Sequence, residues 1–200
     1  MAFEEFVNHG VTSATPENLL LGAGTIHKNL VYDSTTRKWN FEDSLIGATS
    51  GGNKLTIKPE IKQVDVDGAC VRVKGLDIKY GETATLETNL VEVTPDMIKA
   101  SIIGKVDSAN TVPNLTHIVT KSDIEAGDYF ENIGFVGWTG QKKPVIVILE
   151  NAICTSGLSL DGKKKDNAVL KCVFECTADL TNNTVILDKL PVHIYYPTEG

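Results

Sequence analysis

The sequence is poor in arginine, in aromatic residues and in long apolar runs. Only Arg37 and Arg72 are arginines among its 200 residues, and acids outnumber Lys and Arg by 26 to 19, for a formal net charge of −7. Proteins that grip nucleic acids neutralise phosphates with clustered Lys and Arg. The one short basic run, Lys163–Lys165, is followed at once by Asp166. The composition therefore argues against DNA binding in a basic groove.

Membrane and secretion signals are also lacking. The longest apolar run, Val145–Leu149, falls far short of the roughly 18 residues that a membrane-spanning helix needs. The first residues, Met1–Glu5, are acidic and lack the basic-then-apolar order of a signal peptide. We therefore expect no membrane partner and a cytosol-like compartment, where cysteines are reduced. The cysteines are Cys70, Cys154, Cys172 and Cys176.

No pattern in the chain points to catalysis, a cofactor or a metal. Gly-x-Ser-x-Gly, His-Glu-x-x-His and phosphate-loop motifs do not occur. Gly22–Gly24 opens like a dinucleotide-binding loop, but no long helix follows it. Asp65–Gly68 resembles the start of a calcium loop without its terminal glutamate. We therefore predict turns at both places, no catalytic, cofactor-binding or metal-binding residue, and a protein that is not an enzyme.

What the sequence does contain is a strong period of two, which is typical of strands. Ala168–Thr177 alternates apolar with mixed residues and predicts a strand that buries Cys172, Phe174 and Cys176. Val145–Leu149 is apolar on both faces and predicts a central strand. Further strands are predicted at Leu115–Thr120, Phe130–Trp138, Val185–Leu187 and Val192–Tyr196.

Two long segments, Leu55–Val66 and Ala84–Val93, predict the strands of a hairpin. In the first segment the apolar phase switches near Val64, which indicates a bulge. Asp67-Gly68 is a turn signal, and alternation over Ala69–Val73 predicts a short strand after it. A strand whose apolar side chains move from one face to the other can pack on the monomer core with one half and on a neighbouring subunit with the other half.

One helix is well signalled, over residues 94–103. Thr94 suits the N-cap, Pro95 the first turn, and Gly104 the C-terminal stop. Single turns are predicted at Thr15–Glu17 and from Ser122, whereas 33–53 is a long polar connection of the kind that is usually functional or mobile. These elements predict one mainly β domain over 1–200, a β-sandwich or barrel with one flanking helix.

Several segments in the first half of the chain occur in a recognisable order. They are Thr15–Gly24, Lys28–Leu30, Ile46–Asn53, the strand leading to Asp67–Ala69, Ala84–Asn89 and the helix after Thr94. This order resembles the tail tube, or major tail, proteins of tailed bacteriophages, particularly long-tailed siphophages of Gram-positive hosts. The resemblance covers residues 15–104, and the second half is similar only in length and strand-rich character.

The resemblance implies an assembly rather than a reaction. Six copies form a ring whose inner sheets join into a β-barrel, and rings stack into a tube around a tape-measure protein, between tail terminator and distal tail proteins. DNA passes through the lumen without specific binding. The chain would be a virion tail protein made in the host bacterial cytoplasm, with an N-terminal arm (1–18), a stacking loop between rings (33–53) and the 94–103 helix.

Two sets of candidate residues follow from this assignment. Alternation along the predicted hairpin, the candidate lumen wall, gives five lumen-facing acids: Glu60, Asp65, Asp67, Glu87 and Glu92. The stacking loop supplies candidate contacts between rings: Trp39, Phe41, Leu45 and Ile46. A mostly negative wall would keep DNA from sticking during ejection.

Two alternatives remain open from the sequence. One is the inner tube of a contractile tail or tailocin, which shares the fold but is wrapped by a sheath. The other is a β-sandwich module that binds carbohydrate or another ligand. Such a module needs aromatic side chains gathered on one face, whereas Trp39 and Trp138 are far apart in the sequence and aromatic content is only 6%.

Overall fold

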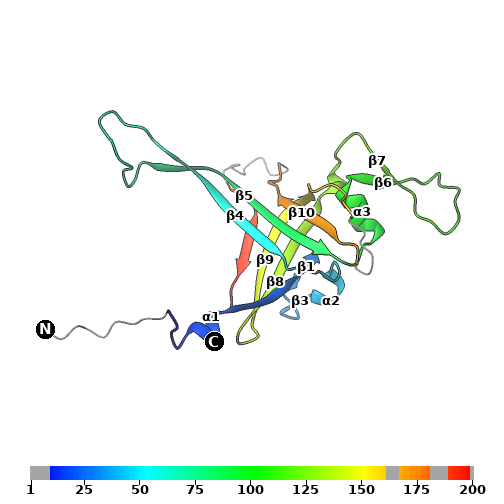
Figure 1. Ribbon diagram of the computed structural model, residues 1–200, viewed down its shortest axis with the longest axis horizontal. Coiled ribbons are helices and arrows are strands. Elements are labelled where there is room, and N and C mark those ends of the chain that lie inside the picture. Colours follow the sequence, from blue (N-terminus) through cyan, green and yellow to red (C-terminus); the bar gives the residue numbers. More distant parts are fainter. Residues whose placement is uncertain (1–9, 161–166, 181–188, 199–200) are drawn as a thin grey trace.

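The protein is mainly β, as the sequence predicts (Figure 1). The computed structural model describes residues 10–160, 167–180 and 189–198. Seven strands form one antiparallel sheet in the order β1-β8-β9-β10-β5-β4, with β11 pairing along β9. Their bounds are β1 Leu20–Lys28, β4 Lys54–Gln63, β5 Asp77–Leu90, β8 Phe130–Thr139, β9 Pro144–Cys154, β10 Leu170–Cys176 and β11 Val192–Tyr195.

The remaining elements are short. Two small antiparallel sheets, β2 with β3 and β6 with β7, stand beside the main sheet. The strand bounds are β2 Tyr32–Asp33, β3 Lys38–Trp39, β6 Gly104–Val106 and β7 Ile118–Thr120. The helices are α1 Thr15–Asn18, α2 Phe41–Ser44, α3 Pro95–Ser101 and the 3₁₀ turn η1 Ala126–Asp128.

One face of the main sheet curls around the core. Leu86 of β5 and Phe174 of β10 belong to the same buried cluster as Ile26 of the edge strand β1, at the other end of the strand order. Asn53, which precedes β4, donates hydrogen bonds to the carbonyl oxygens of Ala23 (2.9 Å) and Gly24 (3.3 Å) in β1. The two edges of the sheet therefore approach each other at this end.

The strongest strand predictions are confirmed. β9 is buried on both faces, because Val147 and Leu149 contribute to the main core while Ile146 and Ile148 form a second cluster on the opposite face. The apolar side chains of β10 alternate as expected, and all four of them are buried: Leu170, Cys172, Phe174 and Cys176. Val185–Leu187 lies outside the described residues.

The predicted helix is present, but its end differs from the prediction. Thr94 caps α3 by accepting from the N–H of Met97 (3.4 Å), and Met97 is buried. The helix ends at Ser101, and the left-handed residue after it is Ile103 (φ 49°) rather than Gly104. Gly104 instead allows β7 to approach closely, because a Cβ there would lie 2.7 Å from the carbonyl oxygen of Val119.

Three other local predictions are wrong. The segment 69–73 forms no strand, although the Asp67-Gly68 turn is present with Gly68 at φ 87°. No turn of helix starts at Ser122; η1 begins at Ala126 with a capping box between Glu125 and Asp128. The turn predicted at Gly22–Gly24 is instead part of strand β1, in which both glycines have positive φ values.

The hairpin of β4 and β5 carries the bulge that the phase change indicates, at a different place. Glu60 pairs with Gly81 and Ile61 with Lys79, so Tyr80 is the extra residue on β5. β5 begins at Asp77, earlier than predicted, and ends at Leu90. The bulge divides the hairpin into a proximal half on the core and a distal half beyond it.

Candidate assembly surfaces

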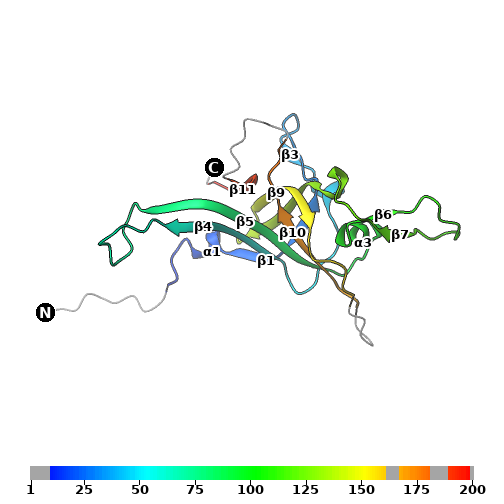
Figure 2. The same cartoon turned by 90° about the horizontal axis from the view of Figure 1, so that it is seen from above.

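The most prominent surface is the distal arm, which we define as residues 61–80. It extends away from the rest of the sheet in both perpendicular views (Figures 1 and 2). Its base is held by a hydrogen bond from the N–H of Val64 to the carbonyl of Leu76 (2.8 Å) and by the Arg72–Asp77 ion pair (3.0 Å). The arm therefore has a defined backbone but no third strand to cover it.

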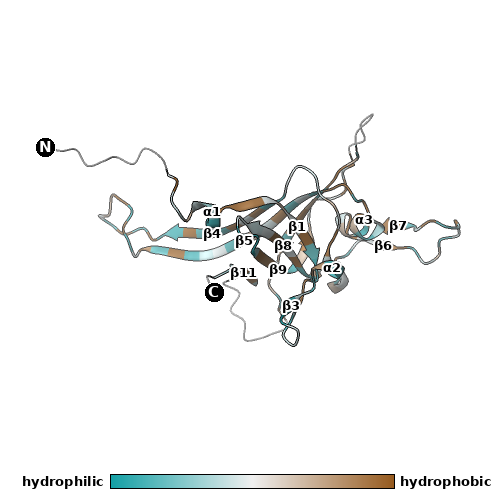
Figure 3. Ribbon diagram, turned by 90° about the horizontal axis from the view of Figure 1, so that it is seen from below, coloured by the Kyte–Doolittle hydropathy of each residue, from teal (hydrophilic) through white to brown (hydrophobic). Residues whose placement is uncertain are grey.

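The distal arm exposes large apolar side chains. Tyr80 is 64% exposed and Val71 is 73% exposed. Figure 3 shows brown apolar segments interspersed with teal ones along this hairpin and its end. The full set comprises Ile61, Val64, Val66, Val71, Val73, Ile78 and Tyr80. A two-stranded hairpin is marginal in water by itself, so this apolar surface favours a partner.

Two strands, β1 and β4, end the strand order. The outer edge of β1 is partly covered by its own chain, because the N–H of Ile46 donates to the carbonyl of Ile26 (2.9 Å) and Leu45 forms a bridge with His27. Among the described strands, β4 pairs only with β5, so its other edge keeps unpaired backbone N–H and C=O groups. Such groups are templates for strand addition by another chain.

The outer face of β4, β5 and β10 is bare and polar. Residues directly paired across strands share a face, so Lys54 and Thr56 of β4 lie beside Glu87 and Thr85 of β5. The side chains on this face of the three strands are exposed or half-buried. Its charged residues nearly balance in number: Lys54, Lys58, Lys62 and Lys171 against Glu60, Glu87 and Glu175.

The five candidate lumen acids do not form one row. Glu60 and Glu87 lie on the bare face, whereas Asp65 and Asp67 lie in the connecting loop of the distal arm and not on a strand. Glu92 follows β5 and accepts a hydrogen bond from the N–H of Ala48 (2.6 Å). Alternation predicts these acids on the polar faces of two long strands. For Asp65 and Asp67 this is wrong, because β4 ends at Gln63, a boundary that the local pattern does not show.

The long connection 33–53 folds back onto its own chain. Trp39 packs against Tyr32 (ring centroids 5.2 Å apart) and Tyr195 (5.1 Å), and Phe41 packs on the second cluster. Ile46 is buried in the main core, so of the four candidate contacts between rings only Leu45 is largely exposed, at 46%. The expectation of a connection without its own structure is wrong, since it contains β3 and α2.

A buried histidine holds this connection in place. His27 of β1 contacts the hydroxyl oxygens of Thr25 (Nε2, 2.9 Å) and Ser44 (Nδ1, 2.9 Å). The Ser44 hydroxyl donates to the carbonyl of Asn40 (2.5 Å), which leaves its oxygen free to accept from Nδ1–H. Burial lowers the pKa of His27, so the neutral ring is favoured.

The same folding gathers aromatic rings that are distant in the sequence. Trp39 contacts Tyr195, and Tyr195 stacks on His193 with centroids 6.5 Å apart and ring planes at 26°. Tyr32 and Tyr195 are each about half exposed. No local pattern predicts this aromatic strip, because the pairing of β11 with β9 that brings Tyr195 to the connection is a long-range contact.

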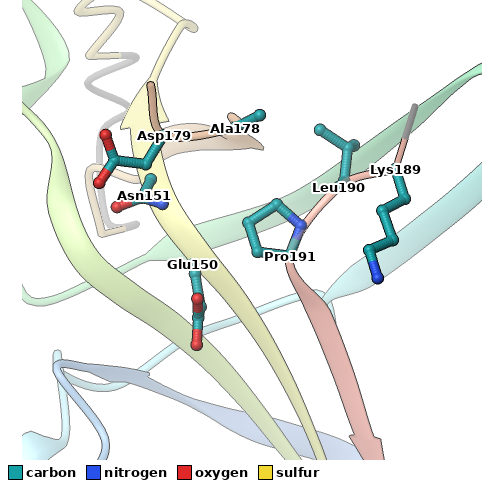
Figure 4. Close-up of a pocket in the computed structure, with 7 residues that line it drawn as sticks. All are labelled: Glu150, Asn151, Ala178, Asp179, Lys189, Leu190 and Pro191. Atoms are coloured by element: carbon teal, nitrogen blue, oxygen red, sulfur yellow. The ribbon is translucent and has the colours of Figure 1, made fainter. Parts of the chain in front are cut away.

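A hollow beside Glu150 and Asn151 does not resemble a catalytic centre. It has a volume of about 300 Å³ and lies where the partner of β9 changes from β11 to β10. In Figure 4 the carboxylate of Asp179 and the amine of Lys189 point in different directions. Among the described residues, no group of three or more His, Cys, Asp or Glu side chains could hold a metal ion.

Comparison with known proteins adds no assignment. No protein-family model matches the chain, and no curated protein is similar to it. Within the described ranges, no helix is long and apolar enough to cross a membrane. A function for this chain must therefore be inferred from its own surfaces.

Proposed function

We propose that this chain is a structural, non-enzymatic subunit of a phage tail tube. In this proposal six copies form a ring, and rings stack around a tape-measure protein into a conduit for DNA. The single curled sheet with α3 beside it would take the place of the β-sandwich expected of such a subunit. Tail terminator and distal tail proteins would bind the ends of the tube in the virion.

The observation that carries the proposal is the distal arm. It places seven large exposed apolar side chains on a hairpin that leaves the core, a costly arrangement for a chain that stays monomeric. Burying apolar surface yields about 25 cal/mol per Å², so covering the arm with a neighbouring copy is strongly favourable. The arm thus replaces the connection 33–53 as the segment proposed to reach the next ring.

The edge of β4 supports the ring itself. In a closed ring of copies, a neighbouring subunit can cover this edge and the part of the β1 edge that the connection 33–53 leaves uncovered, so that no edge remains for uncontrolled pairing. The bare face of β4, β5 and β10 is then the proposed lumen wall. Because four lysines stand against three glutamates on this face, we revise the expected negative wall to a polar wall close to neutrality.

Electron microscopy of the purified protein tests this function. We expect six-fold rings or tubes of uniform diameter at high protein concentration. A chain that remains monomeric over the whole concentration range would contradict the proposal. Whether the tube belongs to a siphophage or to a contractile tail would be tested by whether a sheath protein binds the outside of those tubes.

A second candidate function is favoured by the aromatic strip. Tyr32, Trp39, Tyr195 and His193 provide ring surfaces of the kind that bind sugar rings, and His193 pairs with Glu150 (3.2 Å), whose carboxylate can accept from hydroxyl groups. A monomer that binds oligosaccharides and loses binding on Tyr195→Ala would support a carbohydrate-binding module. Rings or tubes without sugar affinity would exclude it.

A further inference from the structure

The bare face contains a hollow with the composition of an anion site. It has a volume of about 220 Å³ and is lined by residues of the turn before β4 and of β4, β5 and β10: Gly51, Gly52, Asn53, Lys54, Glu87, Asn89 and Lys171. Gly51 and Gly52 both have left-handed φ values (82° and 85°), and a Cβ on Gly52 would meet no atom within 4 Å. A Cβ on Gly51 would lie 3.6 Å from Nδ2 of Asn89, so the left-handed backbone, rather than lack of space, is what favours glycine at both positions.

The two lysines of the hollow come from different strands. Lys54 begins β4, and Lys171 of β10 pairs with Asn89 of β5. Two ammonium groups beside a glycine turn would attract phosphate, because polyanions are bound by clustered cations. What opposes this in the hollow is a single carboxylate, that of Glu87.

Glu87 already occupies the position that an anion would take. Its carboxylate Oε1 lies 2.6 Å from Nζ of Lys54, and Lys171 is close enough to act on it electrostatically. The hydrogen bond from Lys54 lowers the pKa of Glu87, so the carboxylate stays ionised at neutral pH. The net charge of the three groups is +1 with Glu87 and +2 without it.

We propose that Glu87 is a built-in anion that blocks a latent phosphate site on the bare face, formed by Lys54, Lys171 and the Gly51-Gly52 turn. This inference deepens the proposed function, on which it relies only for placing the face in the lumen. In a ring of six subunits the site occurs six times. Removing Glu87 from every copy would therefore strengthen DNA binding by more than a single site could. Because Glu87 pairs with Lys54, a lumen wall that contains lysines would bind passing DNA only weakly.

The experiment compares charge-matched variants of the full chain. Glu87→Gln removes the block, whereas Glu175→Gln removes the same charge from the same face, where no ion pair involving Glu175 is described. Binding of inorganic phosphate is followed by NMR shifts, and binding of a labelled duplex of DNA by fluorescence anisotropy at low salt. We expect Glu87→Gln to bind both about tenfold more tightly than wild type, and Glu175→Gln to stay within about twofold.

A second substitution makes the result specific to the hollow. Adding Lys171→Ala to Glu87→Gln should return both affinities to the wild-type level. Equal gains in Glu87→Gln and Glu175→Gln, or no gain in either, would overturn the inference. Microscopy of the same samples distinguishes this inference from the proposed function. If no rings form but only Glu87→Gln gains affinity for phosphate and DNA, the tail tube is contradicted while the phosphate site is supported.

Discussion

The two halves of the β4–β5 hairpin have opposite environments. In the proximal half, Ala84, Leu86 and Leu90 are buried in the main core and Leu55 packs against it. In the distal half, Ile61, Ile78 and Tyr80 are more than half exposed. One pair of strands thus has a part that folds the monomer and a part with nothing of its own chain to cover it. The bulge at Tyr80 is where one part ends and the other begins.

The largest effect on the stability of the single chain is expected in the proximal environment. Phe174 is fully buried, contacts Phe130 edge-on (ring centroids 5.7 Å apart) and pairs with Leu86 of β5. Phe174→Ala should cost about 3–5 kcal/mol of unfolding free energy, because it leaves a cavity in the core. Urea denaturation measures this cost, and a loss below about 1 kcal/mol would show that the core is not where the structure places it.

Two glycines, one in the packed body and one in the distal arm, test how far the two environments differ. Gly24 in the body and Gly68 in the distal arm both have positive φ, but a Cβ on Gly24 would lie 2.4 Å from the Phe135 ring whereas Gly68 has open space. We expect Gly24→Ala to cost about 3–4 kcal/mol, from backbone strain plus overpacking, and Gly68→Ala about 1–2 kcal/mol, from strain alone. Equal losses in thermal or urea unfolding would mean that the two environments do not differ.

The hairpin shows how far sequence reasoning reaches in this protein. Alternation located β10, and a run that is apolar on both faces located β9, because both patterns are local. The glycines of β1 concealed a strand that β8 stabilises from across the chain. The end of β4 and the bulge at Tyr80 depend on the register between two strands, which no local pattern specifies.

The candidate residues also divide into those that a local pattern places and those that depend on long-range pairing. Glu60 and Glu87 could be placed on one strand face from alternation, but that Glu87 meets Lys54 requires the register of β4 on β5. Trp39 and Phe41 are predicted as contacts between rings, and in the single chain Trp39 contacts Tyr195, which β11 carries. No local pattern places Tyr195 beside Trp39.

Substitutions in the distal arm should leave the single chain almost unchanged. Tyr80→Ser and Ile61→Asp replace exposed side chains, so each is expected to alter unfolding free energy by no more than about 0.5 kcal/mol. Both should nevertheless abolish rings and tubes, since they remove apolar surface from the proposed contact. Val106→Asp, on the exposed β6–β7 hairpin, is the control that should leave assembly intact. Assembly that survives both arm substitutions would contradict the role of the arm.

The smallest effect is expected from pH at His27. Because burial lowers the pKa of His27 below the ordinary value of 6.5, the unfolded chain takes up this proton first as the pH falls. The contribution of His27 to stability is therefore complete above pH 6.5 and declines below it. His27→Gln should flatten this part of the stability curve between pH 7.5 and about 5. Identical slopes for both proteins would contradict a buried neutral ring.

The most direct test of the central claim is hydrogen–deuterium exchange of the wild-type chain at low and at high concentration. If the distal arm is the contact between copies, amides of residues 61–80 should exchange quickly in the dilute protein and become protected as concentration rises. Those of β9 and β10 should be protected throughout. Exchange in the arm that does not depend on concentration would contradict the account.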